Sequence, residues 1–208
     1  ERRFLQGFMI RRTQIVLLVF GALWASLLLS AGKTAPELDV PGITDAPPGG
    51  DFALQTSKGP FRLKDYRGKV VLLYFGYTKC PDVCPTSLSY MAQAFNELND
   101  DELKKVVGVF VSVDPKRDTF ELLDEYVDYF HPNFIGVTGK PEEIAKAAKL
   151  YGAQYYEVEL KDSAFGYAVN HSAATYLIAP DGELRFIFPH GTSPEVISEA
   201  IRYVLEGK

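Results

Sequence analysis

Hydrophobic and polar residues are arranged along the chain in blocks that predict alternating strands and helices. Two mainly apolar runs, at residues 70–75 and 106–113, are typical of strands buried within a sheet. Shorter apolar segments predict further strands, at residues 52–56, 61–63, 134–137, 174–178 and 184–188. The first two of these form an expected hairpin, and the turn sequence Pro180-Asp181-Gly182 joins the last two.

Helical segments alternate with these strands, and capping residues mark their ends. Four helices are expected: residues 85–98 with Pro85 in the first turn, a helix from Asp118 or Thr119 to about residue 129, residues 141–151 ended by Gly152, and residues 194–205 after Ser193. Strand–helix alternation followed by a hairpin and a closing helix predicts an α/β sandwich with a mixed central sheet. This order of elements is thioredoxin-like.

A different hydrophobic pattern lies near the N-terminus, where residues 15–32 carry no charge. A helix needs roughly 20 apolar residues to span a bilayer, and Arg11 and Arg12 predict that the preceding end stays in the cytoplasm. We therefore expect a cytoplasmic segment at 1–14, a single transmembrane anchor at 15–32, a Pro/Gly-rich linker at 33–50 and a thioredoxin-like domain at 51–208. A cleavable secretory signal is the alternative. Both interpretations export the domain, and the anchor would hold it at the inner (cytoplasmic) membrane, facing the periplasm or an equivalent space.

Composition and charge narrow the functional classes. The 208 residues are 47% hydrophobic and 24% charged, as in an ordinary globular protein. The net charge is −5, but residues 34–208 hold 17 basic and 26 acidic side chains, a net of −9. An acidic domain is poorly suited to binding nucleic acid, because phosphate contacts require a basic face. It is better matched to cationic or metal-handling partners.

The only two cysteines of the chain, Cys80 and Cys84, lie four positions apart between a predicted strand and a predicted helix. Because structural disulfides more usually join distant segments, this pairing predicts a thiol site for redox or metal chemistry. Helix N-terminal N–H groups favour thiolates, which are the ligand form of cysteine. Thiolates select copper(I), and an added imidazole also suits copper(II). A reversible disulfide between the two cysteines remains an alternative.

A distant histidine is the expected third ligand. His171 precedes the predicted strand at 174–178, and in a thioredoxin-like sheet the loop before that strand faces the cysteine turn. The alternative for His171 is a hydrogen-bonded structural histidine. His131, which follows a predicted helix, is expected to interact with the helix dipole, and His190 is expected in an exposed loop. Two thiolates and one imidazole would form a three-coordinate copper site with room for transfer to a partner.

Several motifs together resemble the Sco/SenC family. They are Gly76-Tyr77-Thr78-Lys79-Cys80-Pro81-Asp82-Val83-Cys84-Pro85, Val111-Ser112-Val113-Asp114-Pro115-Lys116-Arg117-Asp118-Thr119, Phe134-Ile135-Gly136-Val137-Thr138-Gly139, and Asn170-His171-Ser172 with Pro180-Asp181-Gly182. Members of this family are thioredoxin-like copper-binding proteins that assist the assembly of cytochrome c oxidase. Two positions depart from the family: many members have Asp where Asn170 stands, and some have His where Lys79 stands.

The resemblance implies that Cys80, Cys84 and His171 bind copper and that the protein serves the binuclear copper site of oxidase subunit II. Three functions remain open: a copper metallochaperone without catalytic turnover, a thiol–disulfide oxidoreductase that uses Cys80 and Cys84 as a redox pair, and a copper or redox sensor. Other copper chaperones and thioredoxin-like reductases are further expected partners. The residues before Cys80 do not supply the Pro-x-x-x-Thr-x-x-Cys arrangement of a peroxiredoxin-type peroxidase.

Three aspartates near the predicted site have two interpretations each. Asp114 and Asp118 follow the strand at 106–113 and either dock a partner or tune local charge, although Asp118 is more simply a helix cap. Asp82 lies between the cysteines, where it either shapes the turn through an Asx contact or repels anions.

Overall fold

The computed structural model describes residues 47–161 and 166–207. The predicted cytoplasmic segment at 1–14, the predicted anchor at 15–32 and most of the linker at 33–50 therefore lie outside the described residues. Within the described ranges, no helix combines the length and the apolar character that crossing a bilayer requires.

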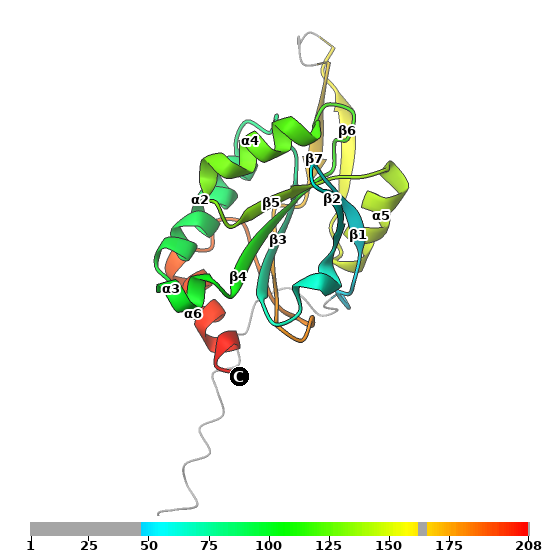
Figure 1. Ribbon diagram of the computed structural model, residues 1–208. Helices are drawn as coiled ribbons and strands as arrows, with labels where there is room; N and C mark the ends of the chain where they lie inside the picture. The colour runs from blue at the N-terminus through cyan, green and yellow to red at the C-terminus, as the bar shows by residue number, and fades with distance from the viewer. Residues whose placement is uncertain (1–46, 162–165, 208) are drawn as a thin grey trace, which may run out of the picture. The chain divides into compact units, whose positions relative to one another are not determined.

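A mixed five-stranded sheet forms the centre of the domain, as predicted (Figure 1). Its strands, in spatial order, are β5 (Phe134–Val137), β4 (Val106–Ser112), β3 (Val70–Gly76), β8 (Thr175–Ile178) and β9 (Leu184–Phe188). The first three are parallel to one another, whereas β8 is antiparallel to both β3 and β9. Every residue of β3 and β4 is buried, which explains why these two strands appear in the sequence as nearly continuous apolar runs.

Helices cover both faces of this sheet. Figure 1 shows α2 (Val83–Asn96), α4 (Phe120–Phe130) and α6 (Pro194–Leu205) on one side, and α5 (Pro141–Leu150) on the other. A four-residue helix, α3 (Asp100–Leu103), precedes β4. The hairpin of β1 (Ala53–Thr56) and β2 (Gly59–Arg62) was also predicted. The 3-10 helix η1 (Leu63–Tyr66), which follows it, was not predicted.

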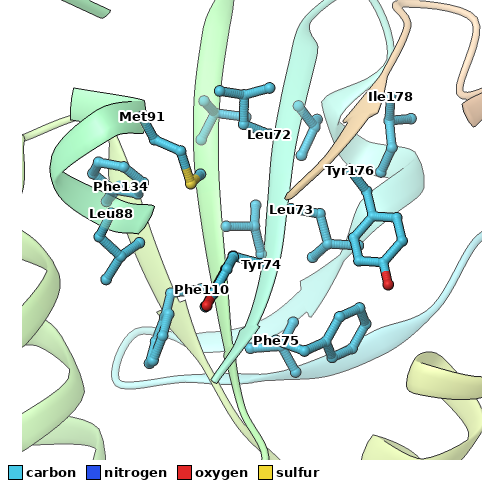
Figure 2. Close-up of a cluster of buried hydrophobic side chains, with 14 of the residues drawn as sticks. Leu72, Leu73, Tyr74, Phe75, Leu88, Met91, Phe110, Phe134, Tyr176 and Ile178 are labelled. Carbon is cyan, nitrogen blue, oxygen red and sulfur yellow. The ribbon is translucent and has the colours of Figure 1, made fainter. Parts of the chain in front are cut away.

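Side chains of the central strand β3 alternate between the two layers of the core. Tyr74 stacks on Phe110 of β4, while Phe75 packs edge-on against Tyr176 of β8 (Figure 2). Leu88 and Met91 of α2 lie on the Tyr74 side, as Figure 2 also shows. The strand that leads to the cysteines is therefore held rigidly from both sides.

A two-stranded antiparallel ribbon, which the sequence pattern did not predict, stands apart from the central sheet. It consists of β6 (Tyr155–Glu159) and β7 (Tyr167–His171), and Tyr155 pairs with His171 in its register. His171 is thus the last residue of a strand, and the expectation that it lies in a loop was wrong. Figure 1 shows this ribbon near the N-terminal end of α4.

Two helix starts also differ from the prediction. Thr119 caps α4 by accepting a hydrogen bond from the Leu122 N–H, so the expectation that Asp118 is the cap was wrong. The helix α2 begins at Val83, two residues earlier than expected. Pro85 remains in the first turn, where its missing N–H removes no helical hydrogen bond, and Cys84 becomes part of the helix.

Candidate metal centre

The cysteine loop begins where β3 ends at Gly76 and finishes where α2 begins at Val83. Within it, Cys80 donates its backbone N–H to the Tyr77 carbonyl, which turns the chain back toward the helix. Cys80 lies at the rim of the site and is 9% exposed, whereas Cys84, in the first turn of α2, is completely buried. Cys80 and Cys84 are not joined by a disulfide. The three residues between them therefore let one sulfur face the surface and the other face the core.

Gly76 is required by the close approach of Cys84 to the end of β3. A Cβ atom at this position would lie 2.6 Å from Cys84 Sγ and 2.9 Å from the Phe110 ring. Real side chains do not approach this closely, so any larger residue would displace the sulfur or the ring. The glycine thus creates the space in which Cys84 sits.

His171 completes a compact group of three donor atoms. Its Nε2 lies 3.2 Å from Cys84 Sγ, and the two sulfurs and the imidazole nitrogen all lie within 4.8 Å of one another. Two ligands on metal bonds of about 2.3 Å can be at most about 4.6 Å apart, so only small movements would be needed to enclose an ion. The structure therefore brings together the three residues that the sequence had suggested as ligands.

A hydrogen bond sets the tautomer of His171. Its Nδ1 lies 3.1 Å from the backbone carbonyl oxygen of Ser172, which can accept a hydrogen bond but cannot donate one. Nδ1 therefore carries a hydrogen, and in the neutral ring the lone pair is on Nε2, the nitrogen nearest to Cys84. The rings of Tyr74 and Tyr77 pack edge-on against the imidazole, with centroids 6.1 and 5.8 Å away, and restrict its rotation.

Burial and hydrogen bonding shift the pKa values of the two cysteines in opposite directions. The Cys84 thiol donates a hydrogen bond that lowers the pKa of Cys80. Burial raises the pKa of Cys84, and the neighbouring Cys80 sulfur raises it further. Burial also raises the pKa of Tyr74, which therefore stays a neutral phenol. The two shifts favour a thiolate at Cys80 and a protonated thiol at Cys84.

These donors fit a soft metal ion. Two sulfurs and one neutral imidazole are ligands that copper accepts in both of its common oxidation states, and zinc also accepts them. His171 is partly exposed and Cys80 slightly exposed, so the group lies close to the protein surface. A site of this kind can bind an ion and still expose it to a partner.

Asp118 fastens the cysteine loop to β4. Its buried carboxylate accepts hydrogen bonds from the Thr78 N–H at 3.0 Å, the Thr78 hydroxyl at 2.6 Å and the Ser112 hydroxyl at 2.6 Å. These contacts hold the loop two residues before Cys80. Asp118 therefore supports the site from inside the protein, where it is not available for docking a partner.

The remaining candidates lie outside the three-residue group. Asp82 is exposed and makes no side-chain capping bond, which removes the Asx interpretation. His131 ends α4 as expected, but burial lowers the pKa of its ring and so disfavours the charged form that interacts best with the dipole. His190 is exposed, as expected, and its Nδ1 lies 3.1 Å from the Ser87 hydroxyl. Asp114 is buried beside Arg117.

Sequence reasoning missed the aromatic and basic residues that surround His171. Tyr77 is part of the cysteine motif and Arg117 part of the second motif, but nothing in their spacing indicates that Tyr77 packs against the histidine or that Arg117 contacts Tyr77. Tyr167 gave no signal at all, because the ribbon that carries it was not predicted.

Comparison with known proteins gives a consistent result. Residues 42–206 match the sequence profile of the SCO1/SenC family. The mitochondrial protein SCO2 homolog of Mus musculus is 39% identical over 204 residues, which cover 95% of this chain and 80% of the relative. Two solved structures of copper-bound ScoI, from Arabidopsis thaliana and Bradyrhizobium japonicum, are 37% and 36% identical to this chain in sequence, each with a TM-score of 0.68. They cover 77% and 76% of this chain, and this chain covers 99% of each.

Proposed function

The chain belongs to the SCO1/SenC family, and from this premise we propose that it is a membrane-tethered copper metallochaperone. Its cargo is copper(I) or copper(II), and its ligands are Cys80, Cys84 and His171. The observation that carries the proposal is the meeting of two sulfurs and a correctly oriented imidazole nitrogen within 4.8 Å. The copper bound in the two similar ScoI structures supports the choice of metal.

The acidities of the thiols suggest an order of binding. Cys80 has the lowered pKa and is the more exposed of the two cysteines, so it is the first ligand that an arriving ion meets. Cys84 then loses its proton, because the positive charge of the ion stabilises the thiolate that burial alone disfavours. The lone pair on His171 Nε2 adds the third ligand and makes the site suitable for copper(II) as well.

Delivery follows from the openness of this site. A three-coordinate ion at the rim can accept a fourth ligand from another protein before its own ligands leave. The recipient that the family resemblance implies is the binuclear copper site of cytochrome c oxidase subunit II. We further propose that residues 15–32 anchor the chain in the inner membrane and that the linker at 33–50 carries the domain into the periplasm or an equivalent space.

A copper-transfer assay tests this function. Copper-loaded protein is mixed with the copper-free soluble domain of subunit II, and the absorption of the assembled binuclear site is followed. We expect transfer by the wild type and by a His190→Ala control, and no transfer by Cys84→Ala. A wild type that retains no copper, or transfer that does not require the cysteines, would contradict the proposal.

The low pKa of Cys80 favours thiol–disulfide exchange as a second candidate function. In this reaction the Cys80 thiolate attacks a disulfide of the recipient and forms a mixed disulfide, releasing one recipient thiolate. Cys84, after losing its proton, then attacks Cys80 and releases the second recipient thiolate, so the recipient gains two electrons and the protein forms a Cys80–Cys84 disulfide. His171→Ala separates the two functions, because copper(II) binding requires the imidazole and exchange does not.

A further inference from the structure

The β6–β7 ribbon carries His171, yet hydrogen bonds to the central sheet do not hold it. Within the part of the chain that the structure describes, β6 and β7 pair only with each other. An isolated two-stranded ribbon is marginally stable in water. Contacts of other kinds must therefore determine where His171 lies relative to the cysteines.

Arg117 supplies such contacts at the start of β7. It lies in the turn between β4 and α4 and donates an Nη1 hydrogen bond to the Tyr167 carbonyl at 2.8 Å. Its guanidinium carbon also lies 3.7 Å from the centroid of the Tyr167 ring, in stacking distance. Tyr167 and His171 are four residues apart on one strand, so their side chains extend from the same face. Fixing Tyr167 thus fixes the face that carries His171.

Asp114 holds Arg117 and Tyr167 in this arrangement. Its carboxylate accepts a hydrogen bond from Arg117 Nε at 2.5 Å and another from the Tyr167 hydroxyl at 2.7 Å. The side chains of Asp114 and Arg117 are only 1% and 16% exposed, so water competes little for these bonds. The three groups form one connected cluster in which each residue contacts the other two.

The same guanidinium reaches the cysteine loop. It lies 5.7 Å from the centroid of the Tyr77 ring, and Tyr77 packs edge-on against His171 with centroids 5.8 Å apart. Arg117 therefore contacts both the loop that leads to Cys80 and the ribbon that ends at His171. We propose that Arg117, together with Asp114 and Tyr167, is a positioning clamp that keeps the His171 imidazole directed at the two sulfurs. This inference rests on the proposed role of His171 as a copper ligand.

The adjacent Lys116 offers a matched control. It also contacts the ribbon, through an ion pair with Glu157 of β6, and its ammonium lies 5.6 Å from the Tyr167 ring centroid. Its side chain is 63% exposed and that of Glu157 is 50% exposed. Exposed pairs of this kind contribute little, and neither residue reaches the cysteine loop through the contacts described above.

The experiment compares Arg117→Ala, Tyr167→Ala, Tyr167→Phe and Lys116→Ala in the full chain. Arg117→Ala leaves Asp114 buried without its ion-pair partner and could therefore fail to fold. Tyr167→Ala tests the clamp without this problem, because it keeps the buried Asp114–Arg117 pair. In the copper-free protein, nuclear Overhauser cross-peaks between the His171 and Tyr77 rings report the position of the imidazole. Copper(II) affinity and the electron paramagnetic resonance signature of imidazole ligation are measured next, and copper(I) affinity reports chiefly the two thiolates.

We expect Tyr167→Ala to lose the cross-peaks and to bind copper(II) about 10- to 100-fold more weakly, as is usual when a residue that orients a ligand is removed. Copper(I) affinity should change less than about threefold, because the two thiolates remain. Tyr167→Phe keeps the stacked ring and should recover most of the copper(II) affinity, and Lys116→Ala should behave as the wild type.

Wild-type cross-peaks or wild-type copper(II) affinity in Tyr167→Ala would overturn the clamp, as would an equal loss in Lys116→Ala. If the wild type bound no copper at all, the proposed function would fail. The cross-peaks of the copper-free proteins would still decide whether the clamp positions His171.

Discussion

The most informative stability prediction compares two adjacent residues, Asp118 and Thr119. The sequence allowed either to cap the helix α4, but the structure gives the cap to Thr119 and makes Asp118 the tether of the cysteine loop. Replacing each by Ala should therefore have very different consequences. Thr119→Ala removes one hydrogen bond at an exposed helix end, which costs about 1 kcal/mol.

Asp118→Ala removes a buried acceptor of three hydrogen bonds, two from Thr78 and one from Ser112. Each hydrogen bond to a charged group contributes about 1.5–3 kcal/mol, but relief of the buried charge offsets part of this sum. We expect a net loss of about 3–5 kcal/mol, the range seen when one partner of a buried charged network is removed. Asp118→Asn should lose less than Asp118→Ala, because its amide oxygen can accept from the Thr78 N–H and its NH₂ group can donate to a hydroxyl that rotates to accept.

Thermal unfolding of the copper-free chain, followed by circular dichroism, measures both effects. For a domain of this size, about 1 kcal/mol corresponds to about 2–4 °C, so Tm should fall by about 3 °C for Thr119→Ala and by about 10 °C or more for Asp118→Ala. Equal shifts for the two variants would refute the view that Asp118 tethers the loop.

Two further predictions concern the cysteines. Gly76→Ala should lower the free energy of unfolding by about 1–3 kcal/mol in a urea titration and weaken copper binding, since the new methyl group overlaps Cys84 Sγ; unchanged stability and affinity would contradict the close approach. Because the pKa of Cys80 is lowered, its thiolate persists as the pH falls, and its alkylation by iodoacetamide should stay near its maximal rate down to about pH 5. Cys84→Ala removes the donor chiefly responsible, so the rate should then fall below about pH 8; a wild-type rate that declines tenfold per pH unit below pH 8 would argue against the thiolate.

The sequence predicted best those elements whose burial or end positions restrict which residue types can occur. The strands β3 and β4 are buried on both faces, so nearly every position had to be apolar. The helix α5 begins with Pro141 and is followed by Gly152, and both residues act locally. For such elements, local sequence and tertiary environment carry the same information.

The β6–β7 ribbon was missed because β6 is mostly exposed and because, among the described strands, β6 and β7 pair only with each other. Tyr156, Glu157 and Glu159 all face solvent, so β6 has no apolar run. The choice between Asp118 and Thr119 as helix cap failed for another reason. Both residue types cap helices well, and only the distant Thr78 and Ser112 draw Asp118 away from that role.

The sequence predicted which residues form the candidate site, but not which side chains hold those residues in place. Cys80 and Cys84 were marked by their spacing, and His171 by the strand that follows it. Arg117 contacts Tyr167, 50 positions away, and also Tyr77 in the cysteine loop, and no local pattern encodes such separations. A long-range contact of this kind is visible only once the chain is folded.

The central claim is that a single distant imidazole joins the two cysteines around copper. Pulsed electron paramagnetic resonance of the copper(II)-loaded chain tests it most directly. For the wild type we expect one coupled imidazole nitrogen and a thiolate-to-copper charge-transfer band in the visible range. For His171→Ala we expect the nitrogen coupling to disappear and copper(II) binding to weaken at least tenfold. Copper(II) bound by His171→Ala with the wild-type spectrum and affinity would contradict it.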